Sequence, residues 1–333
     1  MANNKRKNTS SFISFGIALF VLCLLSLRFG SADIPTRDFF RALCDYDSKT
    51  RFGIIIYSIR LPRMLAGIIA GMGLGMSGAV LQTLTGNKMA SPNLIGVNSG
   101  AGFAVILSLS LFPSLFAAVP FFALAGAFLS ALFIIAVSKK IGMTNGTVIL
   151  VGLAFSSVLS AGISLMSLID SDVLVSYNAF SIGSLSGVAL KDLYVPAVMI
   201  ALSFAICIAL SEKLDILTLG DSAARSLGVN VTQTRILSLL IASACAAAAV
   251  SFAGLLGFVG LMSPHIARHF LSCRAKYIFI SSSLIGAILV TAADLAGRVV
   301  FAPSELPAGI FMALVGAPFF LCLLITGRRK FND

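Results

Sequence analysis

The chain has 333 residues, of which 58% are hydrophobic and 11% are charged, and its mean hydropathy is +1.01. Because soluble domains carry about 25% charged residues, this composition excludes an ordinary soluble protein. The net charge of +11 would suggest a nucleic-acid partner in a soluble protein, but the basic residues here lie in loops and at the termini, as is usual for membrane proteins. The long apolar runs exclude a β-barrel, whose strands alternate apolar and polar residues. The sequence therefore predicts an all-α polytopic membrane protein without a nucleic-acid partner.

Ten apolar runs predict ten transmembrane helices, each of which needs about 17–25 residues. The first run, residues 12–29, follows Lys5-Arg6-Lys7 and is longer than the apolar segment of a signal peptide, which has about 7–15 residues. We therefore expect an uncleaved first helix behind a cytoplasmic tail of residues 1–11, within a single membrane domain of residues 1–333. The other predicted spans are residues 61–84, 94–112, 115–137, 147–169, 192–211, 236–254, a short eighth span broken by Pro264 that ends near Cys273, 277–297 and 308–326.

An even number of spans places both termini on one side of the membrane. Lys5-Arg6-Lys7 and Arg328-Arg329-Lys330 predict that this side is the cytoplasm, because cytoplasmic loops and tails are enriched in Lys and Arg. The predicted first external loop departs from this rule. It carries Arg37, Arg41, Lys49, Arg51 and Arg60. Neighbouring aspartates neutralise part of this charge, and an acidic partner that docks from outside would be a second explanation.

The second predicted span presents a glycine face. Gly67, Gly71 and Gly75 recur at intervals of four, and such a face lets the backbone of another membrane helix approach closely. Gly73, Gly75 and Gly78 also fit the pattern GxGxxG. A dinucleotide site needs that pattern between a strand and a helix N-terminus, whereas here it lies in the middle of an apolar helix. No cofactor is therefore expected in this chain.

The sequence predicts no metal site. The six cysteines are scattered and form no CxxC motif, which is typical of small core side chains. His265 and His269 lie four residues apart on one helix face, but two ligands alone make a weak site. A zinc protease would also need Glu beside the first His, where Ile266 stands. We interpret the two histidines as a polar cap at the cytoplasmic end of the eighth span.

A polar interval at residues 212–235 separates the sixth and seventh spans, and residues 214–232 within it form a predicted cytoplasmic segment. Within it, the residues from Asp221 to Leu227, followed by Gly228, predict a short capped helix that ends at glycine. A short amphipathic helix on the cytoplasmic face could dock in a groove of a soluble partner, and an ordinary loop helix is the alternative. Ser91-Pro92-Asn93 and Ser263-Pro264-His265 follow spans of opposite direction, which favours a weak inverted repeat of the kind that transporters use.

Residues 257–268, GFVGLMSPHIAR, resemble the GFVGLxxPHxxR signature of the permeases of iron-siderophore, haem and cobalamin ABC importers, often called the FecCD or BtuC-like family. Further similar segments follow the family's order, so the resemblance covers about residues 55–325. They are RLPR at 60–63, SGA at 77–79 with Gln82, Asn87 with ASP at 90–92, LIGV at 94–97, SGA at 99–101, GSL at 183–185, LG at 219–220, LGVNV at 227–231, Ala293-Asp294 with Arg298, ELPAG at 305–309 and GAPFF at 316–320. Two positions depart from the pattern: Lys88 replaces a frequent Pro, and no Trp precedes Gly183, where Phe180 lies nearby.

The resemblance implies a BtuC-like permease fold and roles for three groups of residues. The segment that contacts an ATPase would comprise Leu219, Gly220, Asp221, Ala224, Arg225, Leu227, Gly228, Val229 and Asn230. The external docking site would comprise Arg60, Arg63 and Arg298. The translocation path and its gate would comprise Ser77, Gln82, Asn87, Met89, Asn145 and Gly146. Asp294 and Glu305 would act in structure or docking.

The implied function is that of a non-catalytic membrane subunit of an ABC importer that works by alternating access. An iron(III)-siderophore is the first expected cargo, followed by haem and cobalamin. The chain has no GxxxxGK[ST] motif for a triphosphate, so two separate ATP-binding subunits would use ATP and Mg²⁺. The other implied partners are a second permease, identical or paralogous, an extracytoplasmic substrate-binding protein, and the lipid of a bacterial inner membrane.

Three alternatives remain at this stage. A secondary transporter driven by protons or sodium would need paired intramembrane charges, which are scarce in the sequence. An ABC permease for another chelate or an oxyanion would carry the same motifs. A membrane scaffold without a transport role is the third alternative.

Overall fold

The computed structural model describes residues 2–32, 34–45, 50–271 and 274–329, and the regular structure of these residues is helical. Each of the ten predicted spans has a helix as its counterpart, so the all-α prediction is confirmed. These helices are α1 (Ala2–Arg28), α4 (Leu61–Thr85), α5 (Val97–Leu111), α6 (Val119–Ile141), α7 (Asn145–Ile169), α9 (Leu190–Leu217), α11 (Val231–Ala253), α12 (Val259–Phe270), α13 (Ala275–Val299) and α14 (Ala308–Arg329). Within the described ranges, seven helices are long and apolar enough to cross a membrane, while α5 and the described apolar part of α14 are shorter.

Some predicted boundaries differ from the structure or lie outside it. Helix α1 begins at Ala2, so residues 2–11 of the predicted tail are helical. Helix α9 continues to Leu217, six residues beyond the predicted end of the sixth span at 211. Three residues named in the sequence predictions lie outside the described residues: Lys49, Cys273 and Lys330. Two of the aspartates that neutralise the predicted first external loop, Asp33 and Asp47, also lie outside them.

The second span begins earlier than its apolar run indicates. Helix α3 (Arg51–Gly53), the π-helical segment η1 (Ile54–Arg60) and α4 form one unbroken helix of 35 residues. At 1.5 Å per residue this helix is about 50 Å long, whereas the hydrocarbon core of a bilayer is about 30 Å thick. Its first turns therefore extend beyond the membrane.

Four shorter helices complete the described connections that matter for function. They are α2 (Thr36–Asp45), α8 (Ser171–Ile182), α10 (Asp221–Ser226) and the 3-10 helix η2 (Pro92–Ile95). Helix α2 is amphipathic: Phe39 and Ala42 are buried with Ile34 and Ile56 in a small separate core. This core holds α2 against the start of the long helix, so α2 has a fixed place at the end of the bundle.

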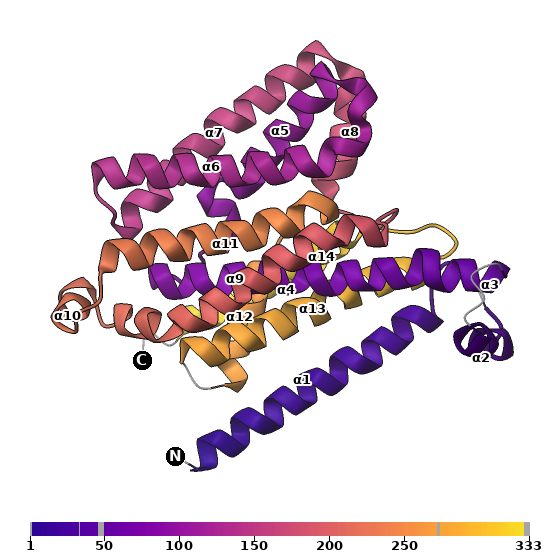
Figure 1. Cartoon of the computed structure of the whole chain (residues 1–333), viewed down its shortest axis with the longest axis horizontal. Coiled ribbons are helices and arrows are strands. Elements are labelled where there is room, and N and C mark those ends of the chain that lie inside the picture. The colour runs from indigo at the N-terminus through magenta and orange to yellow at the C-terminus, as the bar shows by residue number, and fades with distance from the viewer. Residues whose placement is uncertain (1, 33, 46–49, 272–273, 330–333) are drawn as a thin grey trace.

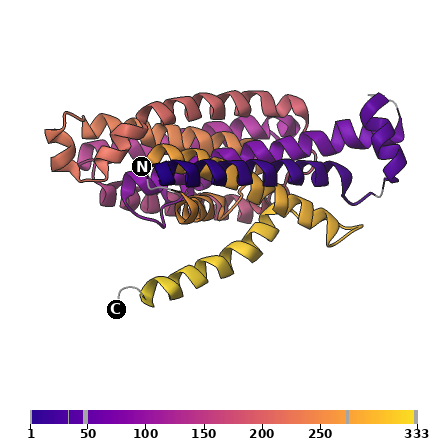
Figure 2. The same ribbon diagram turned by 90° about the horizontal axis from the view of Figure 1, so that it is seen from below.

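The long helices lie in two groups around α4 (Figure 1). Helix α4 packs against α13, α11, α12 and α9, and α1 lies along α13. Helices α5, α6, α7 and α8 form the second group, which contacts the first mainly through α11. Helix α14 leans away from the bundle (Figure 2), and it exposes 63% of Leu314, 58% of Leu321 and 66% of Ile325.

Helix α4 can sit at the centre because its glycines remove the side chains that would hold its neighbours away. A Cβ atom on Gly71 would lie 2.2 Å from the carbonyl oxygen of Gly286 on α13, and a Cβ on Gly78 would lie 1.8 Å from that of Gly260 on α12. Helix backbones therefore touch at these points, as small-residue interfaces in membranes allow. The predicted close approach at the glycine face is confirmed.

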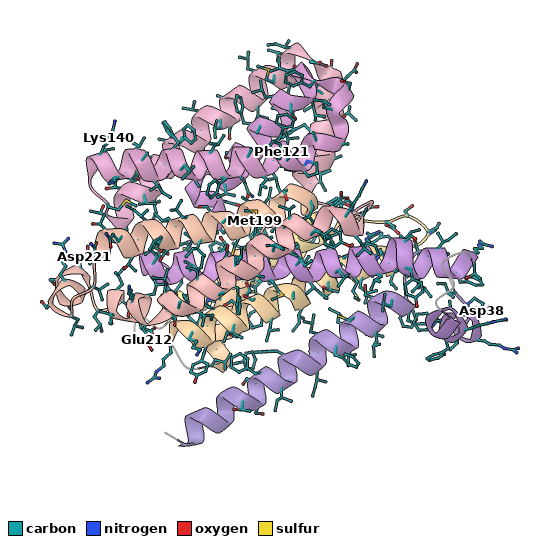
Figure 3. The ribbon with its side chains drawn as sticks, in the orientation of Figure 1. Asp38, Phe121, Lys140, Met199, Glu212 and Asp221 are labelled. Atoms are coloured by element: carbon teal, nitrogen blue, oxygen red, sulfur yellow. The ribbon has the colours of Figure 1, made fainter. Side chains whose placement is uncertain are left out.

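The two ends of the bundle carry different structures. One end, called the α10 end below, holds α10 and the C-terminal end of α14, and the opposite end, called the α2 end, holds α2 and α3 (Figure 1). Lys140, Asp221 and Glu212 lie at the α10 end, and Asp38 lies at the α2 end (Figure 3).

Candidate functional site

The segment between α9 and α11 at the α10 end folds as the sequence predicts. Gly220, at φ +103°, precedes α10. Gly228, at φ +79°, follows its last turn, and this is a backbone conformation that glycine adopts without strain. The Asn230 side chain then caps α11 by accepting a hydrogen bond from the Gln233 amide at 3.0 Å. The predicted short helix that ends at glycine is confirmed.

This segment presents both apolar and polar groups at the surface. Leu219 is 66% exposed and Leu227 is 60% exposed, whereas Ala224 is fully buried against the bundle. Val229 is buried as well. Asp221 is half-buried, and the exposed members of the predicted segment are Leu219, Gly220, Arg225, Leu227, Gly228 and Asn230. Helix α10 is therefore anchored to the bundle through Ala224, and an exposed leucine flanks it at each end.

The two predicted gate loops at the α10 end meet each other within one chain. The Asn145 side chain, at the start of α7, donates a hydrogen bond to the carbonyl oxygen of Thr85 at 3.1 Å. Asn87 is exposed and accepts a hydrogen bond from the Met89 amide at 2.9 Å, and Met89 is 45% exposed. A Cβ on Gly146 would meet nothing within 4 Å. The gating role of these residues stays a prediction.

Ser77 and Gln82, predicted on the translocation path, are buried between helices. Ser77 is 0% exposed and donates a hydrogen bond to the carbonyl oxygen of Ala242 on α11 at 2.6 Å. Gln82 is 2% exposed, and its side-chain oxygen accepts a hydrogen bond from Arg268 on α12. In this conformation both side chains join α4 to its neighbours, and their role in transport stays a prediction.

The three arginines predicted for external docking gather at the α2 end, but they are buried. Arg60, Arg63 and Arg298 are 3%, 5% and 2% exposed. Arg63 pairs with Asp294 through Nε at 2.8 Å and with Glu305 through Nη1 at 2.6 Å. Arg298 pairs with the other oxygen of Asp294 at 3.0 Å. These five residues are called the arginine cluster below.

The arginine cluster also fixes the end of α1. Arg60 donates hydrogen bonds to the carbonyl oxygens of Leu27 and Arg28 at 2.8 and 2.7 Å. Arg298 donates to the hydroxyl of Ser26 at 2.7 Å. Buried cations must be paired or hydrogen-bonded, and here the partners come from α1, α13 and the loop before α14. The cluster therefore joins three parts of the chain that are remote in sequence.

Glu305 is the partly exposed member of the arginine cluster. Partial burial raises the pKa of Glu305, but hydrogen bonds from Arg63 and from the Ser31 hydroxyl outweigh burial, and its pKa lies below the usual value. The Ser31 hydroxyl donates to Glu305 at 2.7 Å. Glu305 is therefore held as a carboxylate at neutral pH, in contact with Arg63.

The exposed basic residues of the α2 end lie on α2 and α3. Arg37 and Arg41 of α2 and Arg51 of α3 are exposed, and Phe40 between the first two is 59% exposed. The sequence analysis named these arginines in the first external loop and gave an acidic partner outside as one explanation for them, but it assigned the docking site itself to the three buried arginines. The sequence pattern that indicates α2 is the spacing of Phe39 and Ala42, which lie three residues apart between charged residues, as on one face of an amphipathic helix.

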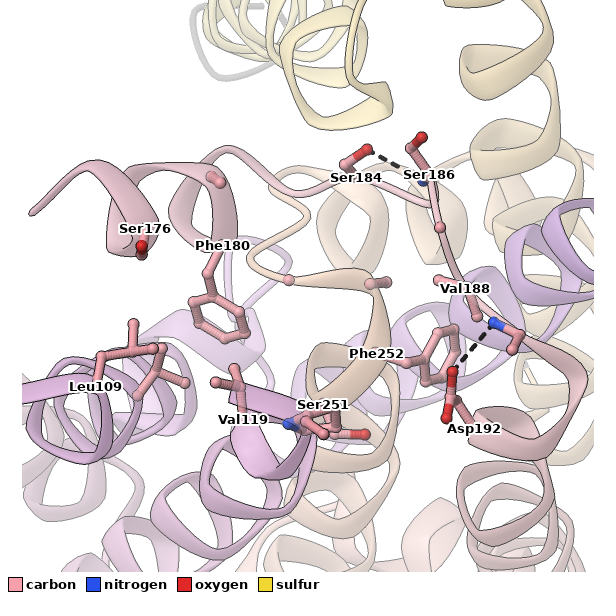
Figure 4. A pocket seen from close by; sticks show the side chains of 18 of the residues that line it. Leu109, Val119, Ser176, Phe180, Ser184, Ser186, Val188, Asp192, Ser251 and Phe252 are labelled. Carbon is pink, nitrogen blue, oxygen red and sulfur yellow. Dashed lines mark hydrogen bonds between the residues drawn. The ribbon is translucent and has the colours of Figure 1, made fainter. Parts of the chain in front are cut away.

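A pocket of about 710 Å³ opens at the α2 end between α5, α8, the start of α9 and the end of α11. Leu109, Phe180 and Phe252 contribute apolar groups to its lining, and Ser184 and Asp192 contribute polar groups (Figure 4). Asp192 caps α9 by accepting a hydrogen bond from the Ala189 amide at 3.1 Å. The size suits a small molecule, and the acid is already engaged in the cap.

The two histidines of α12 contact aromatic rings. His265 packs edge-on against Phe319 of α14, with ring centroids 6.1 Å apart, and His269 packs edge-on against Phe270 at 5.2 Å. Among the residues that the structure describes, no group of three or more His, Cys, Asp or Glu side chains is placed to hold a metal ion.

Arg235, in the first turn of α11, was not identified from the sequence as a functional residue. It is 7% exposed and pairs with Asp221 of α10 at 2.8 Å. The one sequence feature that could have identified Arg235 as functional is its position as a charged residue directly before the apolar run 236–254.

Nearly the whole chain matches the model of one protein family. The model of the FecCD transport family matches residues 18–326. The chain is 35% identical to the Fe(3+)-citrate import system permease protein YfmE of Bacillus subtilis, with 96% of each chain covered. It is 32% identical to the hemin transport system permease protein HmuU of Yersinia pestis, covering 96% of this chain and 97% of the relative. It is 33% identical to the iron(3+)-hydroxamate import system permease protein FhuB of B. subtilis, covering 93% of this chain and 82% of the relative.

Comparison with solved structures agrees with the family assignment. A structure described as an inward-facing conformation of a transporter of the metal-chelate ABC type matches with a TM-score of 0.85 and 27% identity, covering 96% of this chain and 99% of that chain. A chain of PsaBC from Streptococcus pneumoniae in complex with Fab matches with a TM-score of 0.59 at 18% identity, and this likeness shows the fold alone. The predicted BtuC-like resemblance is confirmed. The chain belongs to the FecCD transport family and is a multi-pass membrane permease of the ABC-importer type.

Proposed function

We propose that this chain forms half of the membrane passage of an ATP-driven importer for iron(III) chelates. The observation that carries the proposal is its near full-length similarity to permeases named for ferric citrate, ferric hydroxamate and hemin transport. An iron(III)-siderophore is the first cargo, and haem and cobalamin come next. The chain itself supplies helices and loops that change conformation, and it performs no covalent chemistry.

ATP hydrolysis is assigned to two separate ATP-binding subunits that dock at α10. Leu219 and Leu227 support this proposal, because they are 66% and 60% exposed beside a helix of six residues, and an apolar surface on a polar segment suits a groove in a soluble partner. The α10 end is then cytoplasmic, both termini lie on that side, and the α2 end faces outward from a bacterial inner membrane.

The second permease subunit, identical or paralogous, is proposed to pack against α7 and α14. Helix α14 stands apart from the bundle (Figure 2) and, like α7, carries large exposed apolar side chains, among them Leu168 at 84% and Leu314 at 63%. The gate would then form where the loops around Asn87 and Asn145 of the two subunits approach each other.

A substrate-binding protein is proposed to dock on the α2 end. Arg37 and Arg41 are exposed on α2 and offer forked donors for carboxylates, with Phe40 as an apolar contact between them. Arg60, Arg63 and Arg298 would support this surface from below, because they are buried and already paired within the chain. This proposal moves the docking contact from the buried arginines to α2.

Uptake of labelled iron tests the proposed cargo. The host cells lack their own ferric-chelate permeases and express this chain together with its neighbouring ATP-binding and binding-protein genes. We expect these cells to accumulate iron from a ferric siderophore. Accumulation should stop when the ATP-binding subunit loses its P-loop lysine, because that lysine contacts the nucleotide phosphates. Uptake that persists without the ATPase but collapses with the proton gradient would instead support a secondary transporter.

Replacement of Gly228 by valine tests the role of α10. A β-branched residue is strained at φ +79°, by about 1–2 kcal/mol, so the turn between α10 and α11 should rearrange. We expect iron uptake to fall about tenfold or more while membrane insertion and yield persist, since a Cβ at this position meets nothing within 4 Å. Gly228→Asn is the matched control, because Asn tolerates the left-handed conformation and should retain uptake. Full uptake by the valine variant would contradict the assignment of α10.

A further inference from the structure

One buried guanidinium connects α10 to a loop between two membrane helices. Arg235 lies in the first turn of α11 and is 7% exposed. Its Nη2 donates to the carboxylate of Asp221, the first residue of α10, at 2.8 Å. Its Nη1 donates to the carbonyl oxygen of Met143, in the loop between α6 and α7. The two N–H groups of a planar guanidinium point in fixed directions, so the positions of α10 and this loop are set relative to each other.

The same loop is bonded to the second gate loop. Asn145, two residues after Met143, donates to the carbonyl oxygen of Thr85 at 3.1 Å. The Thr85 hydroxyl accepts from the Asn87 amide at 3.2 Å, and the Asn87 side chain accepts from the Met89 amide at 2.9 Å. An uninterrupted series of bonds therefore runs from Asp221 on α10 to Met89.

A helix-end anchor would be the ordinary role of an arginine at this position, because long basic side chains commonly extend toward the membrane surface. Arg235 does the opposite, since it is buried and two of its nitrogens bind groups inside the chain. Its Nε is buried without a hydrogen-bond partner. Packing alone would not place a cation here, because a buried charge is unfavourable unless its partners are in place.

We propose that Arg235 is the positioning residue that transmits displacement of α10 to the two gate loops, Thr85–Ala90 and Gly142–Asn145. The inference rests on the proposed function, in which α10 binds the ATPase. When the ATPase moves α10, Asp221 moves the Arg235 guanidinium, which moves the Met143 carbonyl. The loop then carries Asn145 and the end of α4 with it. A lysine cannot replace this link, because a single ammonium on a flexible stem does not hold two partners in a fixed geometry.

The test uses the complete transporter, reconstituted in liposomes with its ATP-binding subunits and binding protein. Arg235→Lys keeps the charge and removes the fork, and Asp221→Asn removes the charge from the partner without changing its shape. Three quantities are measured for each variant: ATP hydrolysis, iron uptake, and the ATP-dependent fluorescence change of a label on Met89→Cys in a background without native cysteines. Gln233→Ala is the matched control, because Gln233 is in the same turn with an exposed side chain.

We expect Arg235→Lys to hydrolyse ATP at close to the wild-type rate while uptake falls about tenfold and the Met89 fluorescence change is lost. Asp221→Asn should lose uptake and the fluorescence change in the same way, and no expectation for its ATP hydrolysis enters the test, because Asp221 lies in the docking helix. Gln233→Ala should keep all three. Normal uptake with an intact fluorescence change in both variants would overturn the inference, and so would loss of the ATPase from the purified complex, since Arg235 would then only shape the docking site. Wild-type uptake that proceeds without ATP would overturn the proposed function, and the inference with it.

Discussion

Replacing Gly78 by valine is expected to prevent the helices around α4 from assembling. A Cβ at this position would lie 1.8 Å from the carbonyl oxygen and 2.4 Å from the carbonyl carbon of Gly260. Because both atoms belong to the backbone of α12, no side chain can rotate away, and α4 and α12 must separate. Inserting methyl groups into a packed core typically destabilises the folded protein by about 1–3 kcal/mol. Because the collision here is with backbone, we expect the destabilisation of this variant to reach or exceed the upper end of that range.

Yield of monodisperse protein in detergent and its melting temperature check this expectation. Gly16→Ala is the matched control, because a Cβ at Gly16 in α1 meets nothing within 4 Å and alanine favours a helix by about 1 kcal/mol over glycine. The control should melt at or above the wild-type temperature. A Gly78→Val protein with wild-type yield and melting temperature would show that α12 does not contact α4 as described.

The positions of the membrane helices could be predicted from the sequence because lipid imposes a simple rule. A span needs about 20 apolar residues, and the apolar runs from 61–84 to 308–326 each overlap a helix, with boundaries that differ by several residues. The glycine spacing on α4 also predicted where backbones touch, since a Cβ on Gly71 or on Gly75 would lie 2.2 Å from a backbone carbonyl oxygen of α13. The turn at Gly228 was predictable because glycine adopts without strain the left-handed conformation that commonly ends a helix.

Tertiary pairing could not be predicted in the same way. Arg63 meets Asp294 and Glu305 across 231 and 242 residues of sequence, and no local pattern encodes such a contact. Arg235 binds the carbonyl oxygen of Met143, a group that every residue has, so its partner carries no signature in the sequence. Helix α2 was missed because it lies outside the apolar runs, and its hydrophobic face is only a few residues long.

Removing the Arg63 side chain is expected to destabilise the α2 end strongly. Arg63→Ala would leave Glu305 without its guanidinium partner and Asp294, which is 1% exposed, with Arg298 alone. Breaking a buried ion pair by removing one partner costs about 3–5 kcal/mol, because the remaining charge is left buried. The melting temperature of the purified protein should therefore fall, and the loop before α14 should become accessible to protease. Arg37→Ala on the exposed face of α2 is the control, for which a change within about 0.5 kcal/mol is expected.

The pH dependence of this loss separates an ion pair from simple packing. Because Glu305 has a pKa below its usual value, its contact with Arg63 stabilises the folded protein at neutral pH, and that contribution disappears as the pH falls through the folded-state pKa. The difference in stability between wild type and Arg63→Ala should therefore shrink on acidification below the usual carboxylate pKa of about 4.3. A difference that stays constant as the pH falls well below about 4.3 would assign the effect of Arg63 to packing.

Binding-protein affinity gives the second distinction: Arg37→Glu with Arg41→Glu should weaken docking and its salt dependence without lowering the melting temperature, since exposed charges act through screened, long-range attraction.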